Sequence, residues 1–156
     1  MDLYPILKLI HVLSGAVLFG TGMGIAFFMV WAHRTGRAAA VAEIARIVVA
    51  ADFLFTATAV AVQPISGLML IRLQGYSLVE PWLLGAYVLY GLIGLCWAPV
   101  VVIQMRMRRL AAAAAQAGAP LPPAYHRLFR IWFALGWPAF AGVIGIYVLM
   151  LFKPAF

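Results

Sequence analysis

Residues 9–31 read LIHVLSGAVLFGTGMGIAFFMVW, a stretch without Asp, Glu, Lys or Arg in which His11 is the one ionisable residue. Further stretches share this character: residues 47–71 hold a single charged residue, Asp52, and residues 81–105 and 131–152 hold none. A helix needs about 20 predominantly apolar residues to cross the hydrocarbon core of a bilayer. The sequence therefore predicts an all-α protein, a four-helix transmembrane bundle.

The predicted helices account for nearly the whole chain. We expect them over residues 4–32, 41–73, 80–116 and 124–152, with short connections between them. In a chain of 156 residues they leave no room for a second, soluble domain. Residues 1–156 are therefore expected to form a single integral membrane domain, and the first apolar stretch is too long for a cleaved signal peptide.

The basic residues fall on two sides of the predicted bundle. Eight of the 11 Lys and Arg residues flank the first and third connections, whereas Lys8, Arg72 and Lys153 lie at the opposite helix ends. Short loops rich in Lys and Arg stay in the cytoplasm. We therefore expect both termini on the non-cytoplasmic side of a bacterial inner membrane. We interpret the net charge of +7 as a sign that the basic residues contact anionic lipid headgroups of the bilayer, and not nucleic acid.

Polar groups inside the spans are the candidate functional residues, because burying them in lipid is costly. In the first helix, His11, Gly15, Leu18 and Gly22 fall on one face, and Lys8 flanks it. An imidazole above a glycine groove offers a nitrogen ligand and a flat slot for a planar macrocycle. The alternatives for His11 are a hydrogen-bonded structural histidine and a proton relay.

Gly20 and Gly24 form a G-x-x-x-G pair on a neighbouring face of the same helix. Small residues at this spacing let two membrane helices approach closely. We expect these two glycines to pack against another helix.

The second helix carries a polar stripe, because Asp52, Thr56, Gln63 and Gly67 lie at offsets that share one face. Gln63 is expected level with His11. A carboxyl group as deep as that of Asp52 must be protonated, paired or hydrated. One reading is a structural ion pair with a nearby arginine, such as Arg46, Arg106 or Arg130. The other is proton transfer or contact with a buried ligand, in which Thr56 would take part.

Two motifs carry a resemblance to known membrane families. LKLIHVL at residues 7–13 and QPISGL at residues 63–68 resemble the corresponding helices of HemJ-type protoporphyrinogen oxidases and of CopD-like copper-resistance proteins. The early histidine of HemJ-type proteins is implicated in heme b binding, which implies that His11 is a ligand of heme iron. HemJ-type proteins also have a functional lysine near the start of the third helix, where residues 82–87 here read WLLGAY.

The chain as a whole resembles the bacterial family of predicted integral membrane proteins known as domain of unknown function 2269. The motifs are PWLL at 81–84, WAPV at 97–100, QMRMR at 104–108 and WFALGWP at 132–138. This resemblance implies a fold and brings no settled activity.

Three functions are consistent with these residues. The first is a heme b-binding protein of electron transfer or porphyrin-linked redox chemistry, with cofactor contacts from His11, Gly15, Gly22 and Gln63. In it Lys8, Asp52 and Thr56 make proton or ligand contacts, and a quinone or a redox protein is the partner. The second is a non-enzymatic transporter, metal or lipid handler, or scaffold, assembled as a homo-oligomer. CopD-like copper transport is a third reading, and the sequence leaves open whether the protein is an enzyme.

Overall fold

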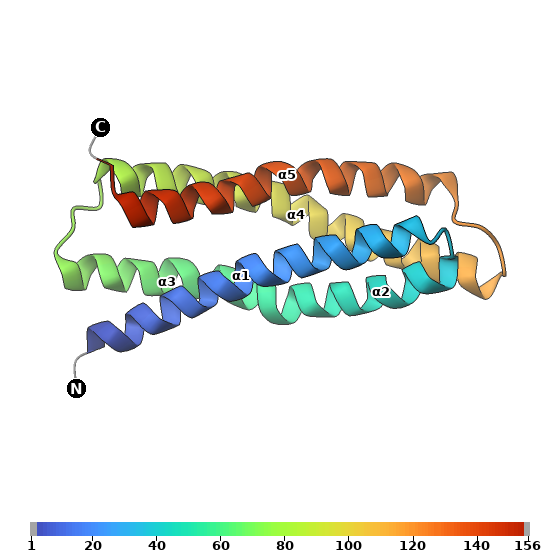
Figure 1. Ribbon diagram of the computed structural model, residues 1–156, viewed down its shortest axis with the longest axis horizontal. Helices are drawn as coiled ribbons and strands as arrows, with labels where there is room; N and C mark the ends of the chain where they lie inside the picture. The colour runs from blue at the N-terminus through green and yellow to red at the C-terminus, as the bar shows by residue number, and fades with distance from the viewer. Residues whose placement is uncertain (1–2, 155–156) are drawn as a thin grey trace.

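The computed structural model describes residues 3–154 and contains four long helices, one of them interrupted (Figure 1). The first is α1 (Leu3–Arg34). The second consists of α2 (Ala38–Ala51), a π-helical segment η1 (Asp52–Thr56) and α3 (Ala57–Gln74). The third and fourth are α4 (Pro81–Gln116) and α5 (Pro123–Phe152). These bounds lie within a few residues of those predicted from the sequence.

All four helices are long and apolar enough to cross a membrane. Most side chains in their most apolar segments lie on the surface of the bundle, so the outer surface of the protein is apolar along these segments. A water-soluble bundle buries its apolar stripe and exposes polar residues. The all-α, four-helix transmembrane fold predicted from the sequence is therefore confirmed, and no strand occurs within residues 3–154.

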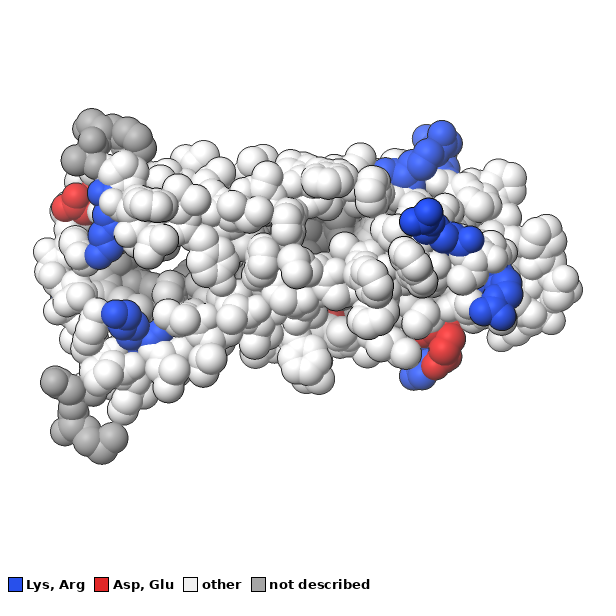
Figure 2. Space-filling model, viewed as in Figure 1, with Lys and Arg blue, Asp and Glu red and all other residues white. Residues whose placement is uncertain are grey.

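The two ends of the bundle differ in charge. The α1–α2 and α4–α5 connections lie at one end, called the basic end below, and the described ends of the chain lie with the α3–α4 loop at the other, called the terminal end (Figure 1). In the view of Figure 2, most charged side chains gather at the two ends, and the band between them shows almost no charge. This band is the part of the surface that suits the bilayer interior.

The π-helical segment lies in the middle of the second span. Its signature is the bond from the Ala57 amide to the carbonyl of Asp52, five residues earlier. Such π segments are rare in proteins, and those that occur often lie at functional sites. Here the segment begins and ends at buried polar residues, Asp52 and Thr56.

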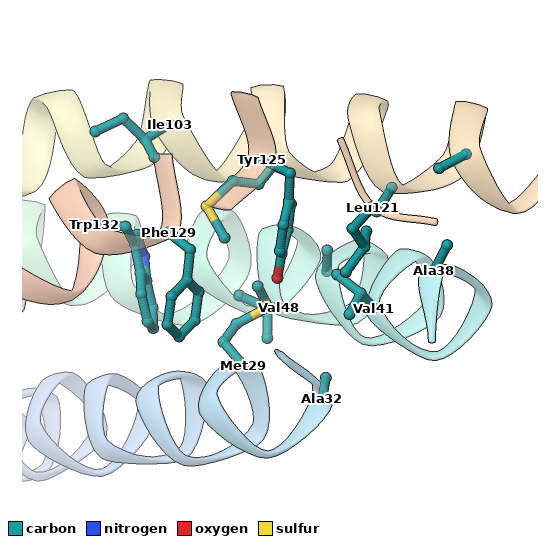
Figure 3. Close-up of a cluster of buried hydrophobic side chains, with 14 of the residues drawn as sticks. Met29, Ala32, Ala38, Val41, Val48, Ile103, Leu121, Tyr125, Phe129 and Trp132 are labelled. Carbon is teal, nitrogen blue, oxygen red and sulfur yellow. The ribbon is translucent and has the colours of Figure 1, made fainter. Parts of the chain in front are cut away.

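The hydrophobic packing is uneven along the bundle. A large cluster of buried side chains joins α1, α2, α4 and α5 toward the basic end, with Met29, Val41, Met107 and Tyr125 at most 1% exposed (Figure 3). Toward the terminal end the buried hydrophobic cluster is small and consists of Ile71, Trp82 and Leu83. There α1 packs on α3 and α4 packs on α5, while α1 and α5 make few contacts. The space between these two helix pairs holds the cavities described below.

The predicted packing of Gly20 and Gly24 is wrong within this chain. A Cβ atom added at either position would meet nothing within 4 Å. Close packing instead uses Gly142 and Gly145 of α5, where an added Cβ would lie 2.8 Å from Ile93 and 2.9 Å from Leu89 of α4. These two glycines let α4 and α5 approach each other closely.

Candidate functional site

His11 is held by a serine of the neighbouring helix. Its Nδ1 lies 2.9 Å from Ser66 Oγ, and Ser66 Oγ donates to the carbonyl oxygen of Val62 at 2.7 Å. Because a carbonyl only accepts, the single hydroxyl proton of Ser66 lies on that second bond. The network therefore assigns the imidazole proton to Nδ1, which donates to Ser66. The Nε2 lone pair has no hydrogen bond to any residue within 3–154.

Gln63 fixes the backbone around His11. Its Nε2 donates to the carbonyl oxygen of His11 and to Ser14 Oγ, both at 2.7 Å. Ser14 Oγ donates in turn to the His11 carbonyl at 3.0 Å. The prediction that Gln63 lies level with His11 is confirmed, and the amide ties α3 to α1.

Two glycines make room for these contacts. A Cβ at Gly67 would lie 3.2 Å from His11 Cε1, so the glycine lets the imidazole approach α3. A Cβ at Gly15 would lie 3.0 Å from the Tyr147 hydroxyl and 3.1 Å from Gln63 Nε2. The flat slot expected beside Gly15 is thus already filled by two side chains, because α5 and α3 both reach into that groove.

A cavity of about 620 Å³, the terminal cavity, lies beside His11. Lys8 and Gly15 of α1, Gln63 of α3 and Gly94 of α4 contribute to its walls, and no atom lies within 4 Å of a Cβ placed at Gly94. Tyr147 and Met150 of α5 and Lys153, which directly follows α5, also line the cavity. Figure 2 shows the surface hollowed close to the terminal end. The volume falls within the range of about 300–1,000 Å³ typical of ligand sites.

The two lysines of this cavity lie near the terminal end. Lys8 is exposed and its Nζ lies 5.7 Å from the centre of the Tyr4 ring. Lys153 Nζ donates to the Tyr76 hydroxyl at 2.7 Å. The cavity therefore combines an apolar interior with two cations at its rim.

Asp52 is 3% exposed and lies deep in the bundle. Its Oδ1 accepts from Trp97 Nε1 at 3.2 Å. In the amide orientation that satisfies both of its neighbours, Gln104 Nε2 donates to Asp52 Oδ2 at 3.1 Å. The Gln104 oxygen then accepts from Trp132 Nε1, also at 3.1 Å. A chain of hydrogen bonds thus joins η1, α4 and α5.

The ion pair considered for Asp52 is not found among residues 3–154. Arg46 instead pairs with Glu43 at 2.6 Å, on the exposed side of α2. Neither Arg106 nor Arg130 bonds to the carboxylate. The indole N–H of Trp97 and the amide N–H of Gln104 take the place of an arginine, because both residues lie on α4 at the depth of Asp52.

A second cavity of about 490 Å³, the central cavity, lies beside Asp52. Thr56 also lines it, and Thr56 Oγ1 is buried without a hydrogen-bond partner. Gly22 borders the same cavity, with nothing within 4 Å of a Cβ at that position. The terminal and central cavities adjoin, because Leu18 and Trp97 contribute to both.

The structure divides the predicted site residues between the two cavities. Lys8, His11, Gly15 and Gln63 line the terminal cavity, and Gly22, Asp52 and Thr56 line the central one. The polar stripe of the second span is therefore split.

Sequence reasoning missed Ser66, Trp97, Gln104 and Tyr147 as functional residues. Ser66 had a usable signal, because it follows Gln63 by three residues and is a polar group on the same helix face. Trp97 and Gln104 are seven residues apart and so share a face, but only the fold places that face against Asp52.

Within residues 3–154 no three His, Cys, Asp or Glu side chains converge as a metal site would require. A site built on His11 would thus rely on one protein nitrogen and on other ligand types.

The fold and the two cavities define a class, an integral membrane protein with four spanning helices and polar side chains directed into internal space. The chain belongs to the family described as predicted integral membrane protein (DUF2269), whose model matches residues 5–154. The resemblance of the whole chain to domain of unknown function 2269 is thereby confirmed. No curated protein and no solved structure matches the chain.

Proposed function

We propose that this protein binds heme b in the terminal cavity, with His11 as an axial ligand, and serves electron transfer or porphyrin-linked redox chemistry. The observation that carries the proposal is the Nδ1–Ser66 bond, which leaves Nε2 with a free lone pair beside a cavity. Histidine ligands of metals commonly donate their other ring N–H to a fixed acceptor, which sets the tautomer and the ring orientation. Ser66 would have this role.

The remaining lining of the terminal cavity supports the same ligand. Heme b is a large, mostly apolar ring with two carboxylates at one edge, and the cavity is mostly apolar with Lys8 and Lys153 at its rim. Tyr147 and Met150 of α5 line the same cavity as His11 of α1. Both side-chain types are known axial ligands of heme iron, so α5 offers candidates for the second position.

Heme b would supply one-electron redox chemistry at its iron. The residues of this chain would do the binding and the positioning. His11 would ligate, Ser66 would hold the imidazole proton on Nδ1, and Gln63 would fix the His11 backbone. The surrounding helices would keep water and lipid headgroups away.

For the orientation, we propose that the terminal end faces away from the cytoplasm in a bacterial inner membrane. The support is the charge count, eight Lys and Arg residues at the basic end against three at the terminal end. The heme site would then lie in the half of the membrane away from the cytoplasm.

An absorption spectrum of the detergent-purified protein, expressed in heme-replete cells, tests the heme proposal. We expect a Soret band that disappears in His11→Ala and persists in His126→Ala, a histidine near the basic end. A colourless wild-type protein, or a band that survives His11→Ala unchanged, would refute the proposal.

A further inference from the structure

The central cavity lies outside the proposed heme site and contains an unsatisfied polar group. Thr56 is 7% exposed, and its Oγ1 makes no hydrogen bond to any residue within 3–154, although this hydroxyl lies close to the Asp52 carboxylate. Asp52 lines the cavity next to it. A buried hydroxyl without a partner is unfavourable for the folded protein. A bound molecule that brings an acceptor atom to this corner of the cavity would satisfy it.

The walls of the central cavity are apolar and rich in flat rings. The aromatic lining residues are Phe19, Phe27, Trp97, Trp132, Phe133, Trp137 and Phe140. Polar side chains in the lining are confined to the corner formed by Asp52, Thr56 and Gln104, together with the indole N–H groups that bond there. The cavity thus suits a flat, apolar molecule with a hydrogen-bonding edge.

The cavity borders the bilayer between α1 and α5, which make few contacts with each other. Two of its lining residues are largely exposed on that side, Phe27 of α1 at 57% and Trp137 of α5 at 63%. A molecule entering here would come from the hydrocarbon, and so it must be soluble in lipid.

The central cavity is a poor site for lipids with a negatively charged headgroup. Among the described residues that line it there is no Lys, Arg or His to receive a phosphate or a carboxylate. A fatty acid would also place its carboxylate near that of Asp52. An uncharged head with a carbonyl or hydroxyl oxygen is compatible with this lining.

We infer that the central cavity is a binding site for a lipid-soluble quinone, with a ring oxygen accepting a hydrogen bond from Thr56 and the ring packed among the aromatic walls. The inference does not depend on heme, because His11 lies outside this cavity.

Fluorescence quenching tests the inference, since quinones quench tryptophan and both Trp97 and Trp132 line the cavity. The titration uses a short-chain ubiquinone analogue and the heme-free His11→Ala protein in detergent, so that failure of the heme proposal leaves it interpretable. We expect saturable quenching whose dissociation constant rises about tenfold in Thr56→Val. Thr58→Val is the matched control, because Thr58 is exposed and already donates to the Leu54 carbonyl at 2.7 Å.

A second variant keeps the test independent of the folding of Thr56→Val. Gly136 lines the cavity and has open space beside it, so Gly136→Leu should fill the site and remove the saturable quenching. Non-saturable quenching that is equal in wild type, Thr56→Val and Gly136→Leu would overturn the inference. Displacement of the quinone by an equal concentration of 1-dodecanol would also overturn it, since the site would then accept any uncharged amphiphile.

Discussion

Tyr90 of α4 donates a hydrogen bond to the carbonyl oxygen of Val60 in α3, the carbonyl that Pro64 leaves without a helical partner. In an α-helix each carbonyl accepts from the amide four residues later, and proline has no amide hydrogen. The bilayer core offers no water to replace the lost bond. A tyrosine of one span therefore completes the backbone bonding of another.

Replacing Tyr90 with phenylalanine should lower the free energy of unfolding by about 1 kcal/mol, because the Val60 carbonyl is left unpaired. Thermal denaturation in detergent measures this change. Tyr87→Phe serves as the control, since Tyr87 lies on the same helix and is 44% exposed.

The same relationship predicts coupling between Tyr90 and Pro64. In a Pro64→Ala background the new amide can bond the Val60 carbonyl, so Tyr90→Phe should cost much less there. If Tyr90→Phe lowered the free energy of unfolding equally in the two backgrounds, Pro64 would not be the reason that the Val60 carbonyl needs Tyr90.

Ser66→Ala should weaken heme binding by about 10- to 100-fold without abolishing it, because His11 keeps its Nε2 and loses the acceptor that orients the ring. Titration of the purified protein with hemin, followed at the Soret band, gives the affinity. Ser77→Ala in the α3–α4 loop should bind as wild type does. An unaltered affinity in Ser66→Ala would mean that the serine does not orient a ligand.

Gln104→Leu should destabilise the fold by about 1–3 kcal/mol, since it leaves both an Asp52 oxygen and the Trp132 N–H without a partner. Chemical denaturation monitored by circular dichroism provides the measurement. Gln116→Leu, an exposed position at the end of the same helix, should have little effect. If the two variants were equally stable, the hydrogen-bond chain from Asp52 to Trp132 would be wrong.

Two glycines of α5 should respond oppositely to alanine. At Gly142 the added Cβ would lie 2.8 Å from Ile93, so Gly142→Ala should cost about 1–3 kcal/mol by overpacking. At Gly136 the same atom would meet nothing within 4 Å, and Gly136→Ala should be neutral or stabilise by up to about 1 kcal/mol through helix propensity. The prediction is that the melting temperature of Gly142→Ala lies below the wild-type value and that of Gly136→Ala lies at or above it. A shift of both melting temperatures in the same direction would contradict it.

The spans could be predicted from the sequence because their signals are local. Apolar composition marks each helix, and the ends carry their own markers. Pro81 and Pro123 each occupy the first position of a helix, and Gly75 ends α3 in the left-handed conformation with φ 69°. Each of these features needs only neighbouring residues to be recognised.

The candidate site could be predicted only in part, because its partners come from distant segments. His11 and Gln63 were identified as polar groups at equal depth, and that inference needed only helix geometry. The partners of Asp52 depend on how α4 faces η1, which no local pattern specifies. The π-helical turn was also missed, because the sequence DFLFT at residues 52–56 has the composition of an ordinary membrane helix.

The location of the large buried cluster separates stability from selectivity. Residues such as Met107 and Tyr125 hold the scaffold together at the basic end, and of the buried residues in this cluster only Ile25 and Trp132 also line a cavity. Changes at wall positions such as Val143 would therefore alter which molecule fits at little cost to folding. The architecture leaves the chain free to acquire new ligands by ordinary mutation while the same core keeps it assembled.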